Sequence, residues 1–270
     1  MLKKRLIFTL LYNQGQFVLS RNFSLQKVGD INWLDKNYDF SRISFSIDEL
    51  IVLDVSRGER NIAEFGAVLR ELSQGCFVPI SAGGGLSDVG AAQRLLRSGA
   101  DKIILNSALY ENESLVNDIA REFGQQCVVA SIDAKRSMDM EWRAFSRNGA
   151  KEMPGGLCDQ FRRILDMPVG EIYLNSMDRD GTGQGFDFEL LSQLPADMAK
   201  PVILAGGAGN GAHLVCGLQH KSIDAVATAN LLNFVGDGLS KARKVIVKAG
   251  IRMAHWDMSL LTMLRTKDEF

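Results

Sequence analysis

The chain carries no excess of either charge and no long apolar run, and both absences exclude classes of protein. Its 270 residues include 31 Lys+Arg and 32 Asp+Glu, a formal net charge of −1. A balanced charge gives no global attraction to nucleic acid or an anionic membrane, so an anionic ligand must be bound by local groups. No stretch approaches the roughly 20 apolar residues of a membrane helix, and the apolar run before Asn13 lacks a small-residue cleavage site. We expect a soluble, cytoplasmic protein with no nucleic-acid or membrane partner.

Cysteine and histidine are also scarce. The four cysteines are widely spaced, without the paired spacing of a zinc knuckle or a redox dithiol, and the three histidines share no ligand-like spacing. We therefore expect reduced thiols, no metal and no cofactor. With 46% hydrophobic and 23% charged residues, the chain can bury a large core.

Short apolar runs alternate with longer amphipathic segments along the chain. Continuous apolar strands indicate burial on both faces, and connections long enough for helices favour parallel pairing in a βα order. The predicted strands are 5–11, 49–55, 77–81, 102–106, 128–133, 171–176, 202–205 and 225–229. The predicted helices are 61–72, 89–96, 114–123, 157–165, 188–194, 212–219 and 239–249.

The sequence also repeats itself. The run Ala82-Gly83-Gly84-Gly85 recurs as Ala205-Gly206-Gly207-Ala208, and Asp101 recurs as Asp224 at the same offset of 123 residues. Eight parallel strands built from two such halves close most simply into a (βα)8 barrel over residues 1–249, with an open doubly wound sheet as the alternative. Apolar residues at helical spacing in the tail, residues 250–270, predict that it packs on the barrel.

Polar residues at the ends of the predicted strands are the first candidates for chemistry, because that face of a barrel carries the active site. Asp133 would act there as a general acid or base, or else pair with Lys135 or Arg136. The glycine runs after the third and seventh strands would cradle phosphate groups of an elongated anionic ligand, or only form tight turns. The candidate binding residues are Gly83, Gly84, Gly85, Asn106, Ser107, Asp178, Asp180, Gly181, Thr182, Gly206 and Gly207.

Four charged residues begin four of the predicted strands. They are Arg5, Glu49, Lys102 and Glu171, two cations and two anions. The N-terminal face of a barrel ordinarily contributes to stability. Alternating charges around one opening would equally form a ring that closes or lines an axial passage.

Several motifs in this order resemble the cyclase subunit of imidazole glycerol phosphate synthase, from about residue 1 to 249. They are Leu2-Lys3-Lys4-Arg5, Ile47-Asp48-Glu49-Leu50, Gly83-Gly84-Gly85, Gly99-Ala100-Asp101-Lys102, Val128 to Arg136, and Asp178 to Thr182. The resemblance implies a barrel that forms a heterodimer with a class I glutaminase subunit and conducts its ammonia along the barrel axis to a phosphorylated substrate. It also implies that the four charges are the ammonia gate, and that Asp101 and Gln126 lie at the glutaminase interface.

The resemblance breaks down at the catalytic positions. Of the two acid–base aspartates of the family, one matches Asp133 and the other matches Leu11; the substrate-holding lysine matches Leu19 and the next glycine Ser20. One positioned acid or base contributes about 10²- to 10⁴-fold, so this loss is severe. The pattern resembles paralogues linked to acetamidino modification of surface polysaccharide, in which a separate ATP-dependent amidotransferase receives the ammonia.

Three hypotheses follow for the function. The leading one is a barrel subunit that conducts ammonia for saccharide amidination. The alternatives are an active cyclase-lyase of histidine biosynthesis, and a non-catalytic scaffold that activates the glutaminase.

Overall fold

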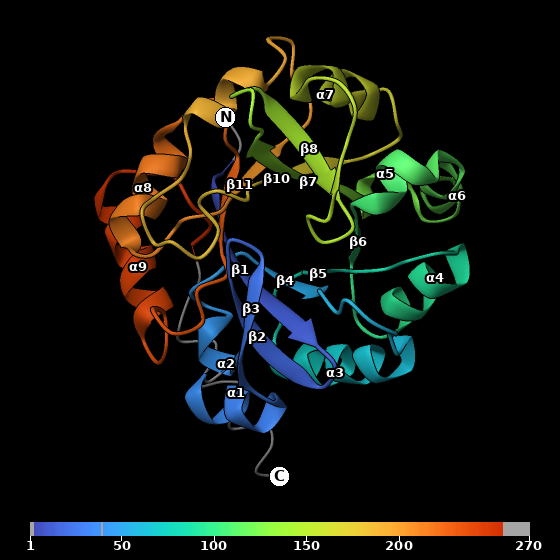
Figure 1. Cartoon of the computed structure of the whole chain (residues 1–270). Helices are drawn as coiled ribbons and strands as arrows, with labels where there is room; N and C mark the ends of the chain where they lie inside the picture. The colour runs from blue at the N-terminus through green and yellow to red at the C-terminus, as the bar shows by residue number, and fades with distance from the viewer. Residues whose placement is uncertain (1–2, 39, 256–270) are drawn as a thin grey trace.

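Eight parallel strands close into a barrel in the structure, a computed structural model that describes residues 3–38 and 40–255 (Figure 1). The barrel strands are β1 (Arg5–Asn13), β4 (Glu49–Asp54), β5 (Ile80–Gly83), β6 (Lys102–Leu105), β7 (Val128–Arg136), β10 (Glu171–Ser176), β11 (Val202–Ala205) and β12 (Ala225–Thr228). They are ordered β10-β11-β12-β1-β4-β5-β6-β7, and pairing of β10 with β7 closes the ring. The predicted (βα)8 barrel is confirmed, and closure leaves these strands no open edge.

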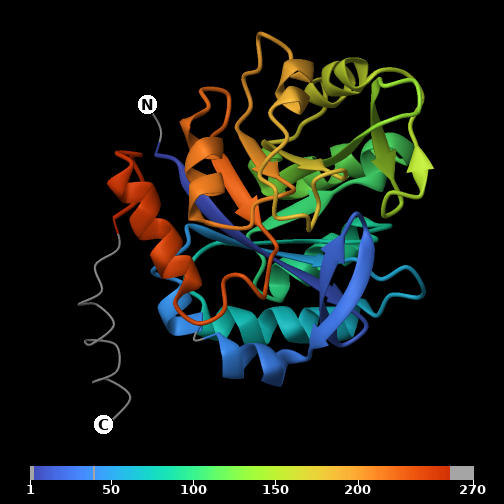
Figure 2. The same cartoon turned by 60° about the vertical axis from the view of Figure 1, so that its left-hand side comes forward.

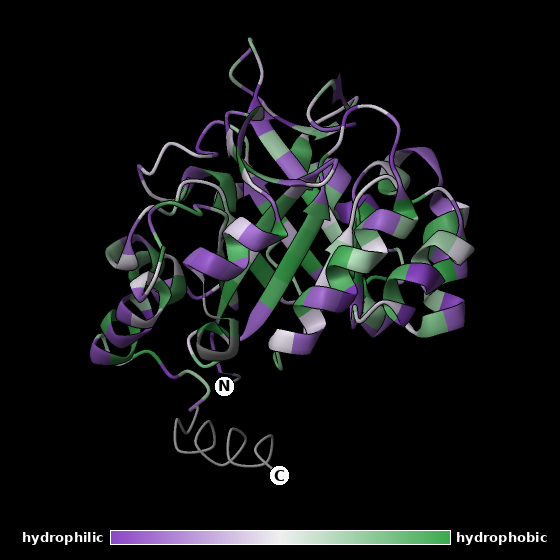
Figure 3. Cartoon of the chain, turned by 90° about the horizontal axis from the view of Figure 1, so that it is seen from below, coloured by the Kyte–Doolittle hydropathy of each residue, from purple (hydrophilic) through white to green (hydrophobic). Residues whose placement is uncertain are grey.

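Helices surround the barrel on all sides. Six of them were predicted: α3 (Ile62–Gly75), α4 (Val89–Arg97), α6 (Glu113–Phe123), α7 (Leu157–Leu165), α8 (Gly211–Gln219) and α9 (Gly238–Lys248). Their apolar sides pack against the strands and their polar sides face outward (Figure 3). Side-chain caps begin several of them; the Asn61 amide oxygen, for example, accepts the N–H groups of Ala63 and Glu64 at the start of α3.

The predictions differ from the structure at two connections. The helix expected over 188–194 is a short 3-10 helix, η2 (Glu189–Gln193), because Pro195 forces the preceding residue into an extended conformation. The third strand begins at Ile80 rather than at residue 77, since Pro79 has no N–H to donate to a strand ladder. Four further short helical segments are α1 (Ile31–Asn37), α2 (Phe40–Ile43), α5 (Ser107–Glu111) and the 3-10 helix η1 (Gln125–Cys127).

Two antiparallel hairpins extend the end of the barrel at which the parallel strands finish. The first is β2 (Gln16–Arg21) with β3 (Ser24–Gly29), and the second is β8 (Trp142–Ser146) with β9 (Lys151–Glu152). They continue from β1 and β7, and both lie at the end opposite the N-terminus (Figure 2). They build walls around the mouth of the barrel.

The half-barrel repeat is visible at the other end as a repeated backbone clamp. The Asp101 carboxylate accepts the N–H of Ile80 at 2.8 Å, and the Asp101 N–H donates to the Ile80 carbonyl at 2.7 Å. Asp224 makes the same two hydrogen bonds to Val202, at 3.0 and 2.9 Å. The repeated aspartates therefore tie neighbouring strands together where those strands begin.

The chain after α9 folds back on the barrel as far as it is described. Met253 is buried and forms a parallel bridge with Lys4, and the Arg243 guanidinium donates to the Ala254 carbonyl at 2.5 Å. Residues 256–270, with the apolar tail side chains Trp256, Leu260, Leu261 and Leu264, lie outside the described residues.

Candidate functional site

A cavity of about 1350 Å³ lies at the mouth formed by the C-terminal ends of the strands. The structure brings ten of the predicted residues together around it: Leu11, Gly84, Gly85, Asn106, Ser107, Asp133, Asp180, Gly181, Gly206 and Gly207. Strand ends and the β2–β3 hairpin supply the walls, so residues far apart in sequence meet here.

Three predicted residues do not line the cavity. Gly83 lies within β5, where a Cβ would collide with the Ile104 carbonyl. The Asp178 carboxylate accepts the Arg136 N–H at 3.1 Å, and the Thr182 hydroxyl donates to the Arg179 carbonyl at 2.8 Å. The structure places all three in support of the strand and loop that carry the cavity residues.

Asp133 projects into the cavity from β7. Its carboxylate accepts hydrogen bonds from the side-chain amides of Asn175, at 2.9 Å, and Asn106, at 3.4 Å. Burial raises the pKa of Asp133 to about 7, the Asn175 hydrogen bond opposes that rise, and the nearby Asp180 charge adds to it. A carboxyl whose pKa is raised toward neutral pH can either donate or accept a proton. Arg136 pairs instead with Glu189.

Leu11 faces Asp133 across the mouth. β1 and β7 lie four strands apart in either direction around the eight-stranded ring, so their ends are opposite each other. The Leu11 side chain is 8% exposed and its neighbours in register are Leu53 and Val18. The position opposite Asp133 therefore holds an apolar side chain that can neither give nor take a proton.

Asp180 is the second carboxylate beside Asp133. It lies in the loop after β10, and its carboxylate accepts the Ser20 hydroxyl and, at 3.0 Å, the Phe23 N–H of the β2–β3 hairpin. Burial raises the pKa of Asp180 as well, while these two hydrogen bonds oppose the rise. The adjacent Gly181 has φ +67°, and a Cβ there would collide with the Ser20 carbonyl. Loop and hairpin are thus packed together around one carboxylate.

The two glycine runs face each other across the cavity. β5 and β11 are also four strands apart in the ring. Gly84 has φ +124° and Gly207 has φ +101°, and a Cβ at either would collide with a backbone carbonyl, of Asp54 and Gly185 respectively. Glycine is required for the turn at both positions, and it also leaves bare backbone facing the cavity, as a phosphate cradle needs.

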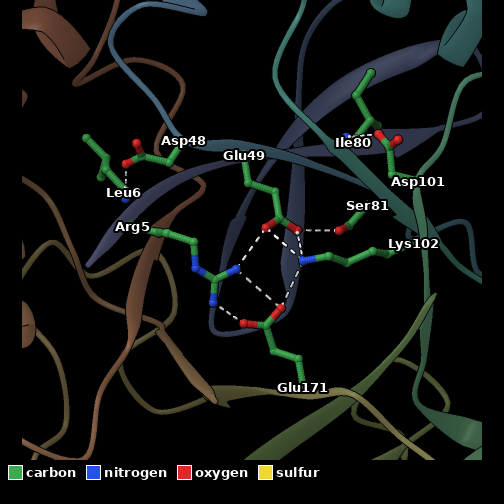
Figure 4. A network of polar contacts seen from close by, with 9 residues as sticks. All are labelled: Arg5, Leu6, Asp48, Glu49, Ile80, Ser81, Asp101, Lys102 and Glu171. Carbon is green, nitrogen blue, oxygen red and sulfur yellow. Dashed lines mark hydrogen bonds and ion pairs between the residues drawn. The ribbon is translucent and has the colours of Figure 1, made fainter. Parts of the chain in front are cut away.

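A closed ring of ion pairs lies at the opposite end of the barrel (Figure 4). Glu49 contacts Arg5 Nη1 at 3.0 Å and Lys102 Nζ at 3.0 Å. Glu171 completes the ring, with Lys102 Nζ at 3.1 Å and Arg5 as its other partner, while Ser81 donates to Glu49. Burial alone would lower the pKa values of Arg5 and Lys102. The attraction of the Glu49 and Glu171 carboxylates is larger, so both pKa values are raised. Both cations therefore stay charged, and the four side chains form one continuous ring of ion pairs.

The barrel lumen joins the ring to the cavity. Along β10, Glu171, Tyr173 and Asn175 alternate toward the axis, from the ring through the lumen to the hydrogen bond on Asp133. The lumen is otherwise lined by a buried apolar cluster: Ile7, Ile51, Ile104, Val129, Ile203, Ala205, Ala225 and Ala227. Tyr173 therefore lies between the ring and Asp133 along the axis.

The remaining two predicted residues lie at the ring end. Asp101 directly precedes β6 and Gln126 lies in η1, which precedes β7. Both are exposed. Exposed polar residues beside the ring are what a protein partner docked over that opening would meet.

Spacing in the sequence did not identify Asn175, Tyr173 or Arg60, which also line the cavity. The strict alternation of Glu171, Tyr173 and Asn175 along one predicted strand was the available signal for the first two. Arg60 lies six residues beyond the end of its strand, and only the folded loop brings it to the site.

The fold and the site define a (βα)8-barrel protein with a charged ring at one end of its axis and a cavity lined by two carboxyls, Asp133 and Asp180, at the other. The chain belongs to the histidine biosynthesis protein family, whose model matches residues 24–236. It is 45% identical over 267 residues to the "Putative imidazole glycerol phosphate synthase subunit hisF2" of Parasynechococcus marenigrum (strain WH8102), covering 98% of this chain and 99% of the relative.

Two streptococcal relatives are more distant. The imidazole glycerol phosphate synthase subunits HisF of Streptococcus gordonii (strain Challis) and Streptococcus sanguinis (strain SK36) are each 32% identical over 254 residues, covering 94% of this chain and 99% of each relative. The family resemblance seen in the motifs is thereby confirmed. No helix in the described part of the chain is both long and apolar enough to cross a membrane.

Proposed function

We propose that this chain is the barrel subunit of a glutamine amidotransferase complex that carries ammonia from a class I glutaminase, docked beside Asp101 and Gln126, through the barrel. The ammonia then serves the amidination of a saccharide by a separate ATP-dependent enzyme, and the cavity holds a phosphorylated ligand on its two glycine loops. One observation carries the proposal: the ion-pair ring is complete while the position opposite Asp133 is Leu11. A subunit that delivers ammonia would retain the ring, whereas Leu11 removes one of the two carboxyls that the resemblance assigns to cyclisation.

The ring suits a regulated entrance for ammonia. Four alternating charges that neutralise each other close the axis to bulk water, and opening requires only that one pair separates. Beyond the ring the apolar lumen admits neutral NH₃ far more readily than NH₄⁺, because a buried unpaired charge is costly. Ammonia released in a docked partner would therefore travel without being protonated.

A second function, the working cyclase-lyase, is favoured by Asp180. Its carboxyl lines the same cavity, has a raised pKa and interacts electrostatically with Asp133. A carboxyl with these properties would supply the proton transfer that Leu11 does not.

Deletion of the gene in its own host separates these functions. An ammonia-delivery subunit predicts loss of acetamidino groups from the surface saccharide, measured by mass spectrometry, with growth on medium lacking histidine unchanged. Histidine auxotrophy with intact amidination would overturn the proposal in favour of the cyclase.

A further inference from the structure

Arg60 lies directly on the glycine run after β5. It is the residue before the N-cap of α3, at the end of the loop that follows β4. A Cβ on Gly85, which has φ +63°, would collide with the Arg60 side chain at both its aliphatic and its guanidinium atoms. The guanidinium therefore covers the predicted phosphate cradle and depends on glycine at position 85.

The N–H donors of the Arg60 guanidinium have no hydrogen-bond partner among the described residues. Its one ionic contact among the described residues is Nε to Asp54 Oδ1 at 3.8 Å, and the Nε atom is buried without a hydrogen-bond partner. The side chain is 29% exposed, and it lines the cavity. Arginine carries five N–H donors in a planar fork that matches a phosphate or carboxylate. A buried donor beside an open cavity is arranged to meet an acceptor that enters it.

Two other arginines of the cavity wall, Arg57 and Arg147, already have partners. The Arg57 guanidinium donates to the Phe23 carbonyl. Arg147 makes two hydrogen bonds of 3.0 Å to the Glu111 carboxylate, one from Nε and one from Nη2. The Asp54 carboxylate also accepts the Ser56 N–H at 2.9 Å, so Arg60 is not its sole partner.

We propose that Arg60 binds one phosphate group of the cavity ligand, together with the backbone at Gly84 and Gly85, and so selects phosphorylated over neutral compounds. The proposal rests on the phosphorylated ligand of the proposed function. On the β2–β3 side, the cavity wall includes Leu19, which is partly buried and uncharged, and Arg21, which ends β2 and is exposed. Arg60, from the loop between β4 and α3, is the cation that lies against Gly85.

The test is phosphate binding by the purified chain, measured by isothermal titration calorimetry with inorganic phosphate and with glycerol 3-phosphate. Arg60→Gln should weaken binding at least tenfold and Arg60→Lys less, because lysine keeps the charge but loses the fork. Arg94→Gln is the matched control, since Arg94 lies on α4, away from the cavity, with its side chain 55% exposed and paired with Asp88. Thermal unfolding of each variant confirms that the barrel is intact.

Crystals of the same proteins soaked with phosphate provide the second readout. We expect an anion beside Gly85 in the parent and its loss in Arg60→Gln, while the site beside Gly206 and Gly207 is kept. Equal or tighter phosphate binding by Arg60→Gln would overturn the inference, because Arg60 would then block the phosphate site instead of binding the phosphate. Failure of the parent to bind phosphate would overturn it too. No glutaminase takes part in either assay, so these results stand apart from those on ammonia delivery.

Discussion

Replacing Leu11 by aspartate should create cyclase activity in this chain. The change places a carboxyl across the mouth from Asp133, whose pKa of about 7 keeps it ready for proton transfer at neutral pH. A second positioned acid–base group is worth about 10²- to 10⁴-fold in rate. Leu11 is 8% exposed, so its loss removes apolar burial worth about 2 kcal/mol, which a barrel of this size tolerates.

The assay is turnover of phosphoribulosyl formimino aminoimidazole carboxamide ribonucleotide with saturating ammonium and no glutaminase. Leu11→Asn is the matched control, because it has the shape and polarity of aspartate but cannot transfer a proton. We expect activity in Leu11→Asp alone, and its loss again in the double variant with Asp133→Asn. Parent turnover equal to that of Leu11→Asp would refute the reasoning and point to Asp180 as the second group.

Three further predictions concern stability. Between about pH 4 and 7, Asp133 keeps its proton in the native state and loses it in the unfolded chain, so the free energy of unfolding falls as pH rises through this window. In urea unfolding, Asp133→Asn should be more stable than the parent by about 2 kcal/mol at pH 8 and equally stable at pH 4. The value at pH 8 is smaller than the full pKa shift implies, because the cavity is open to solvent. Gly84→Ala should lose more than about 2 kcal/mol in thermal unfolding, whereas Gly236→Ala, at φ +65° with nothing within 4 Å, should lose about 1; equal losses would contradict the collision with Asp54. Removing Asp48 from its buried pair with Arg243, two contacts of 3.0 Å, should cost about 3–5 kcal/mol, and Asp237→Ala, in an exposed pair with Lys241, under about 1.

The barrel could be predicted because its strands are buried on both faces. A continuous apolar run such as Val128 to Ile132 has few other interpretations when long amphipathic segments flank it. The repeated glycine runs then indicated two halves of four strands each. The hairpins β2–β3 and β8–β9 were missed, because short strands that pair only with their neighbours resemble loops in composition.

The site was predictable only where the position of a residue along a strand decides which way its side chain points. Asp133 and the glycine loops follow strand ends, so the barrel geometry alone brings them to the mouth. The contacts of Asp133 with Asn175, and of Arg60 with Gly85, join separate elements through their side chains. No spacing in the sequence encodes such contacts, because they depend on loop conformation and rotamers.

The central claim, that ammonia travels along the axis, is tested most directly by isotope tracing in the reconstituted complex of barrel, glutaminase and amidotransferase. Glutamine labelled with ¹⁵N at the amide is supplied with an excess of unlabelled ammonium, and the ¹⁵N fraction of the amidinated sugar is measured. Ala225→Leu fills the lumen above the ring, and Ala63→Leu, exposed on α3, is the control. The account predicts high ¹⁵N incorporation in the parent and control, and a fall in Ala225→Leu with glutaminase activity retained. Incorporation that is unchanged in Ala225→Leu would contradict it.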